Sequence, residues 1–458
     1  MWASQAPVSR RERWLLAVIS VAPPLLYLLV RFLGYMKYVK LAAIAAVALG
    51  GATVMFLRPM WGLWLIVFYV YGGLAFYFPF NAAGLMSLLV LAAVALDLIM
   101  GGSNRLTDPF FWYACALFLL ISVGSMVWAP DPNLSLFEIS TYAKMVALTY
   151  FIVQLVRTPD DLRRLMYVIF AGGLATVFFG VMNLALGIQS VGDNYIHGSS
   201  YMLRFMGTHE NPNRAAAFMC TSLPFGIFAL RHARRSLRPL IILAILILVL
   251  AIFATFSRSV FFPLTVILLA VLIREVRSKR SYAMLAVAVA IGCVLVPREY
   301  LERVFALRDA FETTTLDWSV YTRLLALQTA WEMFLHHPLT GIGIGNFITA
   351  AAYKVFVRIV VHNSYLEILV GTGVFGLLSF LFIMLSGFRH TVEGVRERWK
   401  RQPDWMRSAC FYCMLSAISI WMSAFFGTMP FRQPFWIPIG MGLVIANLLR
   451  EDRGAAAS

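Results

Sequence analysis

Five side chains between positions 204 and 362 are suited to a phosphorylated substrate. They are the arginines Arg204, Arg214, Arg258 and Arg323 and the histidine His362. A guanidinium keeps its charge and donates paired hydrogen bonds from a planar fork, which matches the oxygens of a phosphate. Several arginines that converge on one site would therefore suit a diphosphate. The alternative for each arginine is a structural role, in which the side chain reaches from an apolar segment to the nearest polar surface.

His362 is followed by Asn363 and, one helical turn after that, by Glu367. An imidazole, with an ordinary pKa near about 6.5, can accept a proton or donate a hydrogen bond, so His362 is a candidate general base. Glu367 would lie on the same helix face as Asn363 and could orient His362 indirectly or pair with an arginine. A structural histidine and a salt bridge between Glu367 and a neighbouring helix remain open alternatives.

Other motifs favour structural interpretations. Gly371, Gly373 and Gly376 spell G-x-G-x-x-G, but a dinucleotide-binding fingerprint follows a strand and opens a helix, whereas these glycines lie inside an apolar run. Close helix packing or a kink is the better explanation. The adjacent pair His336 and His337 is only a weak metal signal, and the sequence has no HExxH motif or P-loop, so we expect no metal.

The composition places these residues in a membrane protein. Apolar residues make up 61% of the 458 residues and charged residues only 13%, against about 45–50% and about 25% in ordinary soluble domains. The net charge of +16 is spread in short patches between apolar runs rather than on one soluble face, which argues against nucleic acid as a partner. The five cysteines lie in or beside apolar runs and indicate no disulfide framework.

A transmembrane helix needs about 20 mostly apolar residues. The first apolar run has no small-residue cleavage site after it, so we expect it to be a retained span. Fourteen candidate spans emerge: 14–31, 41–57, 60–79, 82–100, 110–128, 137–156, 165–188, 212–230, 239–256, 259–273, 282–297, 362–388, 408–428 and 434–449.

The distribution of basic residues predicts the orientation of these spans. If the N-terminus is cytoplasmic, the cytoplasmic segments hold nearly twice as many Lys and Arg residues as the outer ones, as the positive-inside rule requires. The first outer loop, with Arg31, Lys37 and Lys40, is an exception. Both termini are therefore expected in the cytoplasm, and the four candidate arginines and His362 fall on the outer side.

The longest polar stretch, residues 298–361, is also on the outer side. We expect a helical cap there, lying on the membrane surface between an N-terminal bundle of about 11 spans (1–297) and a C-terminal part of about 3 spans with a short tail (362–458). In the second of two amphipathic cap helices, apolar side chains recur at helical spacing from Leu324 to Leu335, and Pro338 ends the helix. The three glycines at 341, 343 and 345 predict a flexible turn after it.

The segment that begins at His362 resembles the ligase motif of the bacterial O-antigen ligases and polysaccharide polymerases. That motif is His, then Asn, Ser or Gln, nine residues, Gly, two residues, and Gly, Thr or Tyr. His362, Asn363, Gly373 and Gly376 match it. The preceding segment 331–347, the turn 257–259 and the segment 211–213 are similar to further landmarks of the family, so the resemblance covers about residues 204–388.

This resemblance implies a fold and an activity. The family's fold is an all-α polytopic bundle, usually of about twelve spans, so we expect 12–14 here, with an extracytoplasmic cap. The implied activity is that of a membrane-embedded glycosyltransferase of the C type in the bacterial inner membrane, with its site facing the periplasm. The donor would be a glycan on undecaprenyl diphosphate, and the acceptor would be lipid A–core, another lipid-linked glycan or a protein.

The resemblance also implies roles for the candidate residues. Arg204 and Arg258 would hold the diphosphate, with Arg214 and Arg323 as further candidates, and would stabilise the charge that grows on it as it leaves. His362 would deprotonate or orient the acceptor hydroxyl, supported by Asn363, Glu367, Gly373 and Gly376. Arginines make a metal or other cofactor unnecessary. A polymerase using the same donor site, a lipid-linked glycan flippase and a non-catalytic assembly subunit remain alternatives.

Overall fold

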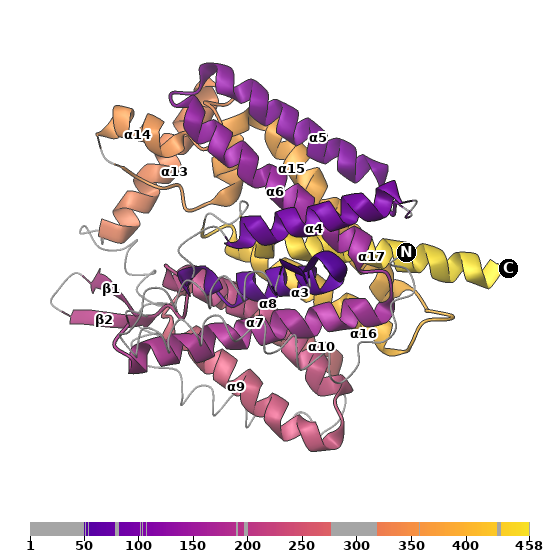
Figure 1. Ribbon diagram of the computed structural model, residues 1–458. Coiled ribbons are helices and arrows are strands. Elements are labelled where there is room, and N and C mark those ends of the chain that lie inside the picture. The colour runs from indigo at the N-terminus through magenta and orange to yellow at the C-terminus, as the bar shows by residue number, and fades with distance from the viewer. Residues whose placement is uncertain are drawn as a thin grey trace.

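The computed structural model describes residues 50–275 and 318–457, apart from short gaps at 51, 54, 78–81, 101, 103, 107, 189–190, 197–199, 357 and 428–431. The described chain is a bundle of α-helices (Figure 1). Its main helices are α3 (Pro59–Tyr71), α4 (Ala82–Ile99), α5 (Pro109–Gly124), α6 (Pro132–Leu155), α7 (Pro159–Ala185), α8 (Pro212–His232), α9 (Arg238–Ala254), α10 (Phe261–Glu275), α15 (Ser364–Arg396), α16 (Trp405–Ser423) and α17 (Gln433–Ala457).

Smaller elements connect these helices. Short 3-10 helices are η1 (Leu74–Tyr77), η2 (Ser125–Trp128), η3 (Arg235–Leu237) and η4 (Arg258–Val260), and two further α-helices are α13 (Trp318–His336) and α14 (Phe347–Val355). An all-α fold was expected, but β1 (Val191–Ile196) and β2 (Ser200–Phe205) form an antiparallel hairpin in which Gly192 pairs with Arg204.

Among the described residues, five helical segments are long and apolar enough to cross a membrane: 109–128, 132–155, 159–185, 235–254 and 364–396. The expectation of an all-α polytopic membrane protein is therefore confirmed. Each candidate span within the described residues corresponds to a helix, although α3 and α4 are shorter than a full span. The candidates at 14–31 and 282–297 and most of 41–57 lie outside the described residues, as does the first part of the cap, 298–317.

Several helices begin at a proline that follows a capping residue. Proline suits the first helical turn because its missing N–H would have no intrahelical partner there. Asp131 accepts a hydrogen bond from the amide of Asn133 at the start of α6. Thr158 forms a reciprocal capping box with Asp161 at the start of α7. These local signals fix where each helix starts and therefore which residues lie at the ends of the bundle.

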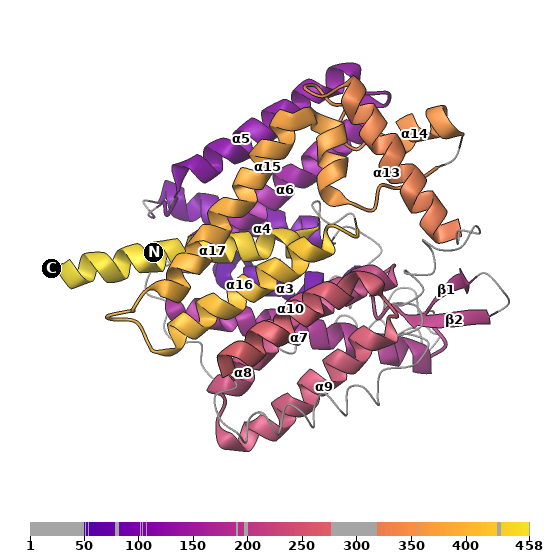
Figure 2. The same cartoon turned by 180° about the vertical axis from the view of Figure 1, so that it is seen from behind.

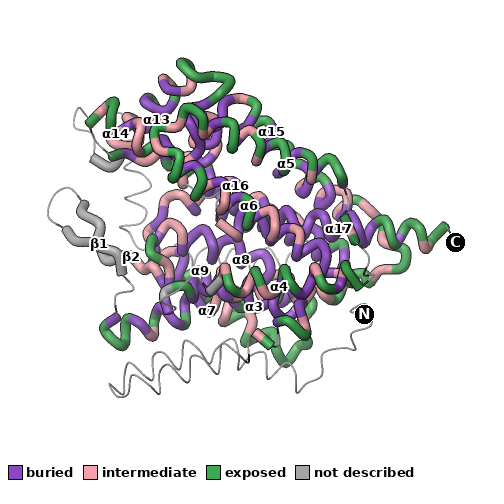
Figure 3. Tube along the Cα trace, turned by 45° about the horizontal axis from the view of Figure 1, so that its top comes forward, coloured by how far each residue is buried: buried purple, intermediate pink, exposed green. Residues whose placement is uncertain are grey.

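The helices differ in how far the rest of the protein covers them (Figure 3). The largest fully buried side chains include Trp436 and Phe435 of α17 and Phe380 of α15. In contrast, only 17% of the apolar window of α9 is buried. On α5, exposed side chains at 110, 113, 117 and 120 follow helical spacing along one face. These uncovered apolar faces are suited to lipid rather than water.

The bundle has two distinct ends. The β-hairpin, α13 and α14 lie at one end, which we call the hairpin end, and the C-terminus of α17 lies at the other (Figures 1 and 2). On α13, the stretch expected to be amphipathic is helical and ends at His336, as predicted. Its small side chains Ala326 and Ala330 pack inward, whereas Trp331 is half exposed.

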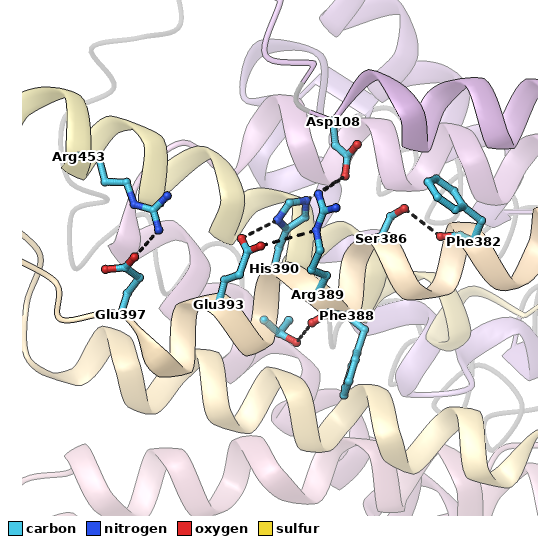
Figure 4. Close-up of polar contacts among 10 residues, drawn as sticks. Asp108, Phe382, Ser386, Phe388, Arg389, His390, Glu393, Glu397 and Arg453 are labelled. Atoms are coloured by element: carbon cyan, nitrogen blue, oxygen red, sulfur yellow. Dashed lines mark hydrogen bonds and ion pairs between the residues drawn. The ribbon is translucent and has the colours of Figure 1, made fainter.

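Ion pairs connect helices near the opposite end (Figure 4). Asp108, which precedes α5 and is 6% exposed, contacts His390 at 3.0 Å and Arg389 at 3.2 Å, both on α15. Glu393, one turn later, contacts the other ring nitrogen of His390 at 3.3 Å. Arg453 on α17 pairs with Glu397 in the same region. These contacts hold α5, α15 and α17 together away from the hairpin end.

Candidate functional site

Arg204 is held at the hairpin end by two hydrogen bonds. It lies near the end of β2 and is only 7% exposed. Its Nε donates to the carbonyl of Thr255 at 2.8 Å, and one terminal nitrogen donates to Oδ1 of Asn213 at 2.8 Å. Arg204 thereby joins the hairpin to the end of α9 and to the start of α8.

Arg258 lies three residues after Thr255, in the turn between α9 and α10. Phe256 in this turn has a left-handed backbone (φ +49°), which reverses the chain within a few residues. The hydroxyl groups of Ser257 and Ser259 are 2.8 Å apart, and the amide of Ser257 donates to the hydroxyl of Thr255. Arg258 is half-buried. Arg204 and Arg258 are therefore brought to the same turn.

Arg214 lies next to this arrangement, in the first turn of α8. The side chain of Asn211 caps the helix by accepting from the amides of Asn213 and Arg214. Arg214 forms a salt bridge of 3.0 Å with Glu210, whose side chain is 84% exposed. Because Asn213 also accepts from Arg204, the segment 210–214 connects both arginines.

The loop that precedes α8 contains His209, which was not among the candidates predicted from the sequence. The hydroxyl of Thr208 donates to the carbonyl of Gly72 at 2.6 Å, so the loop covers the end of α3. His209 lies 3.3 Å from the hydroxyl of Thr176. Burial, together with the positive charge of Arg214, lowers the pKa of His209 to about 3. The ring is therefore neutral at physiological pH and supports the loop rather than carrying charge.

His362 and Asn363 form the start of α15. Asn363 caps the helix by accepting from the amides of Tyr365 and Leu366 at 3.1 Å, and His362 has a left-handed backbone (φ +51°). Partial burial and the positive charge of Arg323 on α13 lower the pKa of His362. Arg323 is therefore close enough to act on His362 electrostatically, and both residues lie outside the membrane-spanning part of α15.

The end of α16 connects the His362 region to the Arg258 turn. The amide of Ser364 donates to the carbonyl of Ala424 at 2.9 Å, and its hydroxyl donates to the carbonyl of Gly427. Phe426 stacks on Phe262, which follows η4, with ring centroids 5.8 Å apart. His362 and Arg258 therefore lie on segments that pack on the same end of α16.

The glycine pattern of α15 produces a break in the helix. Gly373 has φ +72° and ψ −173°, so the kink that the sequence predicted is present. The carbonyls of Val370 and Gly371 accept from the amides of Ile342 and Gly343 at 2.9 and 3.1 Å. Val374 in turn donates to the carbonyl of Pro338 at 2.9 Å. The loop between α13 and α14 thus replaces the hydrogen bonds that the break removes.

This loop was expected to be a flexible turn, but it is packed on several elements. The amide of Ile344 donates to the hydroxyl of Ser125, and its carbonyl accepts from the hydroxyl of Ser135 at 2.8 Å. The side-chain Nδ2 of Asn346 donates to the carbonyl of Asp131 at 3.1 Å. A Cβ at Gly341 would collide with the backbone of α15. The glycines are therefore explained by close approach to α6 and α15.

Three residues near these groups were not selected from the sequence. Glu138 on α6 interacts electrostatically with Arg432, which precedes α17. Tyr142, one turn after Glu138, interacts with both Glu138 and Glu367. Burial and the charge of Arg214 lower the pKa of Arg432 to about 10. A carboxylate inside an apolar span such as that of α6 is itself a signal that could have identified Glu138.

Among residues 50–275 and 318–457, no group of three or more His, Cys, Asp and Glu side chains is arranged to hold a metal ion. The ring of His336, one of the two histidines noted as a weak metal signal, instead contacts the carbonyl of Glu332 at 2.7 Å. The pair Cys410 and Cys413 is buried within α16.

The segment from α9 to α15 is similar to a known family. Residues 242–381 match the O-antigen ligase family. The resemblance to O-antigen ligases and polysaccharide polymerases is therefore confirmed, and it supports a function of that general type. The O-antigen ligase match includes Arg258, Arg323 and His362, whereas Arg204 and Arg214 precede it. None of the curated proteins compared with the chain matches it.

Proposed function

We propose that the protein transfers a glycan from an undecaprenyl-diphosphate donor to a hydroxyl group of an acceptor. One observation carries this proposal. The side chain of Arg204 binds the turn that contains Arg258, and the end of α16 connects this turn to the segment of His362. Two fixed guanidinium groups suit a diphosphate, and a neutral imidazole suits a hydroxyl that must lose a proton. The O-antigen ligase match over 242–381 supports the same reaction class.

In this mechanism Arg204 and Arg258 bind the diphosphate oxygens and stabilise the negative charge that develops when the bond to the glycan breaks. Arg214 and Arg323 increase the positive potential around the leaving group. His362 accepts the proton of the attacking hydroxyl, or orients that hydroxyl, while the oxygen forms the new glycosidic bond. Asn363 caps α15 and fixes the backbone from which the imidazole extends. The arginines supply the positive charge that a metal ion provides in other transferases.

The decisive experiment uses purified protein in proteoliposomes with a glycan-diphosphate lipid and a rough lipopolysaccharide acceptor. Transfer should persist in EDTA, and Arg258→Ala should lower it more than Arg258→Lys, which keeps the charge but loses the paired geometry. Losing a charge-assisted contact to phosphate should lower the transfer rate by about ten- to a hundredfold. Arg358→Ala, which removes an exposed charge from the segment before His362, is the matched control. Wild-type transfer by both Arg258 variants would contradict the proposal.

A ligase and a polymerase would use the same donor site and differ only in the acceptor. Offering the rough lipopolysaccharide and a second lipid-linked repeat unit in competition separates the two, because each product has a characteristic size. A flippase would move the donor without forming a glycosidic bond. Its ionisable residues are expected near the bilayer midplane, whereas the arginine candidates here gather at the hairpin end.

We further propose that the hairpin end faces the periplasm and that both termini are cytoplasmic. This orientation follows from the distribution of basic residues. Tyr353 on α14 is 76% exposed, so a cysteine introduced there, in a background without native cysteines, should react with an impermeant thiol reagent in intact spheroplasts. Labelling only after lysis would place the site on the cytoplasmic side and overturn the proposed donor.

A further inference from the structure

A second polar cluster lies beside the proposed donor site. It consists of Glu138 and Tyr142 on α6, Glu367 on α15 and Arg432 before α17. Tyr142 interacts electrostatically with both carboxylates, and Arg432 interacts with Glu138. The four residues therefore lie close enough to act on one another electrostatically, although they come from three separate segments of the chain.

One close approach and one electrostatic interaction place this cluster at the hairpin end. A side chain at Gly345, in the loop after α13, would collide with Glu138, so the loop packs directly on this carboxylate. Arg432 also interacts with Arg214 and Glu210 at the start of α8. The cluster thus lies between the loop 338–346 and the arginines of the proposed donor site.

The hydroxyl group of Tyr142 is available for a hydrogen bond with a polar partner. Tyr142 is only 4% exposed, and none of the residues that the structure describes forms a hydrogen bond with its hydroxyl. Within the same described ranges, no side chain or amide donates to the half-buried carboxylate of Glu138 either. Both groups lie on a helix that is apolar enough to span a membrane, where unsatisfied polar groups are costly. Their arrangement therefore favours a polar ligand.

The charges of the cluster restrict the kind of ligand. Two carboxylates would repel an anion such as a phosphate, and the guanidinium of Arg432 would repel a cation. A sugar is neutral, and each of its hydroxyl groups both donates and accepts. Carboxylates accept hydrogen bonds, a guanidinium donates them, and a phenol does both, so the set is complementary to a polyhydroxylated ligand.

We propose that Glu138, Tyr142, Glu367 and Arg432 bind the acceptor sugar of the transfer reaction. This inference rests on the proposed glycosyltransferase function. Glu367 lies on the same half of the broken helix α15 as Asn363, directly after His362. A sugar held by Glu367 and the α6 residues is therefore next to the group that takes the proton of the attacking hydroxyl.

Kinetics with the donor and acceptor varied separately test this subsite. Glu138→Gln and Tyr142→Phe preserve side-chain size and should raise the KM for acceptor by about tenfold, the effect of losing one strong hydrogen bond. The KM for donor should not change. Glu332→Gln is the matched control, because Glu332 is an exposed carboxylate on α13 that pairs with Lys354. An unchanged acceptor KM in both cluster variants would overturn the inference.

A binding measurement separates failure of this subsite from failure of the proposed function. Saturation-transfer NMR with deacylated core oligosaccharide needs no donor, so it reports on the acceptor alone. Signals with wild-type protein that weaken in Tyr142→Phe and Glu138→Gln, but not in Glu332→Gln, would support the subsite even if no transfer occurred. Equal signals in wild-type and cluster variants would refute it even if transfer were robust. Monodisperse elution of each variant confirms that it is folded.

Discussion

Arg204 donates through Nε to the carbonyl of Thr255 at 2.8 Å, three residues before Arg258. The buried guanidinium of Arg204 thus holds the turn from which the side chain of Arg258 extends. The Nε group is committed to the backbone and one terminal nitrogen to Asn213, so Arg204 both supports the site and adds charge to it.

Replacing Arg204 should therefore affect stability as well as transfer. Arg204→Ala removes two charge-assisted hydrogen bonds from a buried position, each of which contributes about 1.5–3 kcal/mol to the folding free energy. Asn213→Ala removes one of the two and keeps the charge, so its effect should be smaller. Thermal unfolding in detergent and transfer activity are the measurements. Equal melting temperatures for Arg204→Ala and wild type would show that the hairpin does not depend on this contact.

The pH dependence of transfer should report the environment of His362. Burial and Arg323 lower its pKa, so the neutral imidazole persists below the ordinary value near about 6.5. The acidic limb of the rate profile should lie below that value, and Arg323→Gln should move it to higher pH. Arg358→Gln removes an exposed charge from the segment before His362 and should leave the limb in place. No movement in Arg323→Gln would mean that the two side chains do not interact in the membrane.

The same shift has a consequence for stability. The folded state disfavours protonated His362. The contribution of the neutral imidazole to the free energy of unfolding is therefore fully present above the ordinary pKa. It is lost as the pH falls through that value towards the lower folded pKa. His362→Gln should therefore reduce the acid sensitivity of the melting temperature.

A side chain at Gly373 should disrupt the break in α15. Gly373 has φ +72°, and an added Cβ would collide with the carbonyl of Leu339. Gly187 has nearly the same backbone angle, φ +66°, but open space around it. Gly187→Ala should thus cost only the backbone strain of about 1–2 kcal/mol, whereas Gly373→Ala should lower the melting temperature more. Similar effects of the two substitutions would mean that the loop after α13 can move away from α15.

The buried contact between Asp108 and His390 should contribute more to stability than the exposed pair in the same region (Figure 4). Asp108 and His390 are each 6% exposed, so Asp108→Ala removes a buried contact and leaves His390 and Arg389 with Glu393 alone. Leaving a buried hydrogen-bonding group without its partner costs about 1–3 kcal/mol. Glu397 and Arg453 are 36% and 61% exposed, and Glu397→Ala should cost no more than about 1 kcal/mol. A larger loss of melting temperature in Glu397→Ala would reverse this order.

Much of the fold was predictable because its signals are local. The span expected at 212–230 corresponds to α8 at Pro212–His232, since a capping residue, a proline and terminal charges mark its ends. The kink at Gly373 also followed from glycines within an apolar run. The hairpin 191–205 was not predicted, because its polar residues lack the alternation typical of a half-buried strand.

The site was only partly predictable, for a physical reason. Arg204 and Arg258 could be selected from their residue type, but their meeting at Thr255 depends on how the hairpin packs on α9. Glu138 and Arg432 are 294 positions apart, and only the packing of α6 and α17 brings their charges together. The glycines at 341–345 indicated a turn, but not that its amides complete the hydrogen bonds of α15.

The broken helix α15 also bears on how the chain enters the membrane during synthesis. The carbonyls of Val370 and Gly371 would each cost several kcal/mol if they entered hydrocarbon without donors. Their donors, Ile342 and Gly343, lie 28 positions earlier and leave the ribosome first. The loop and the span can thus insert together as one unit. A truncated chain that begins after residue 346 should integrate this span poorly, although its hydropathy is unchanged.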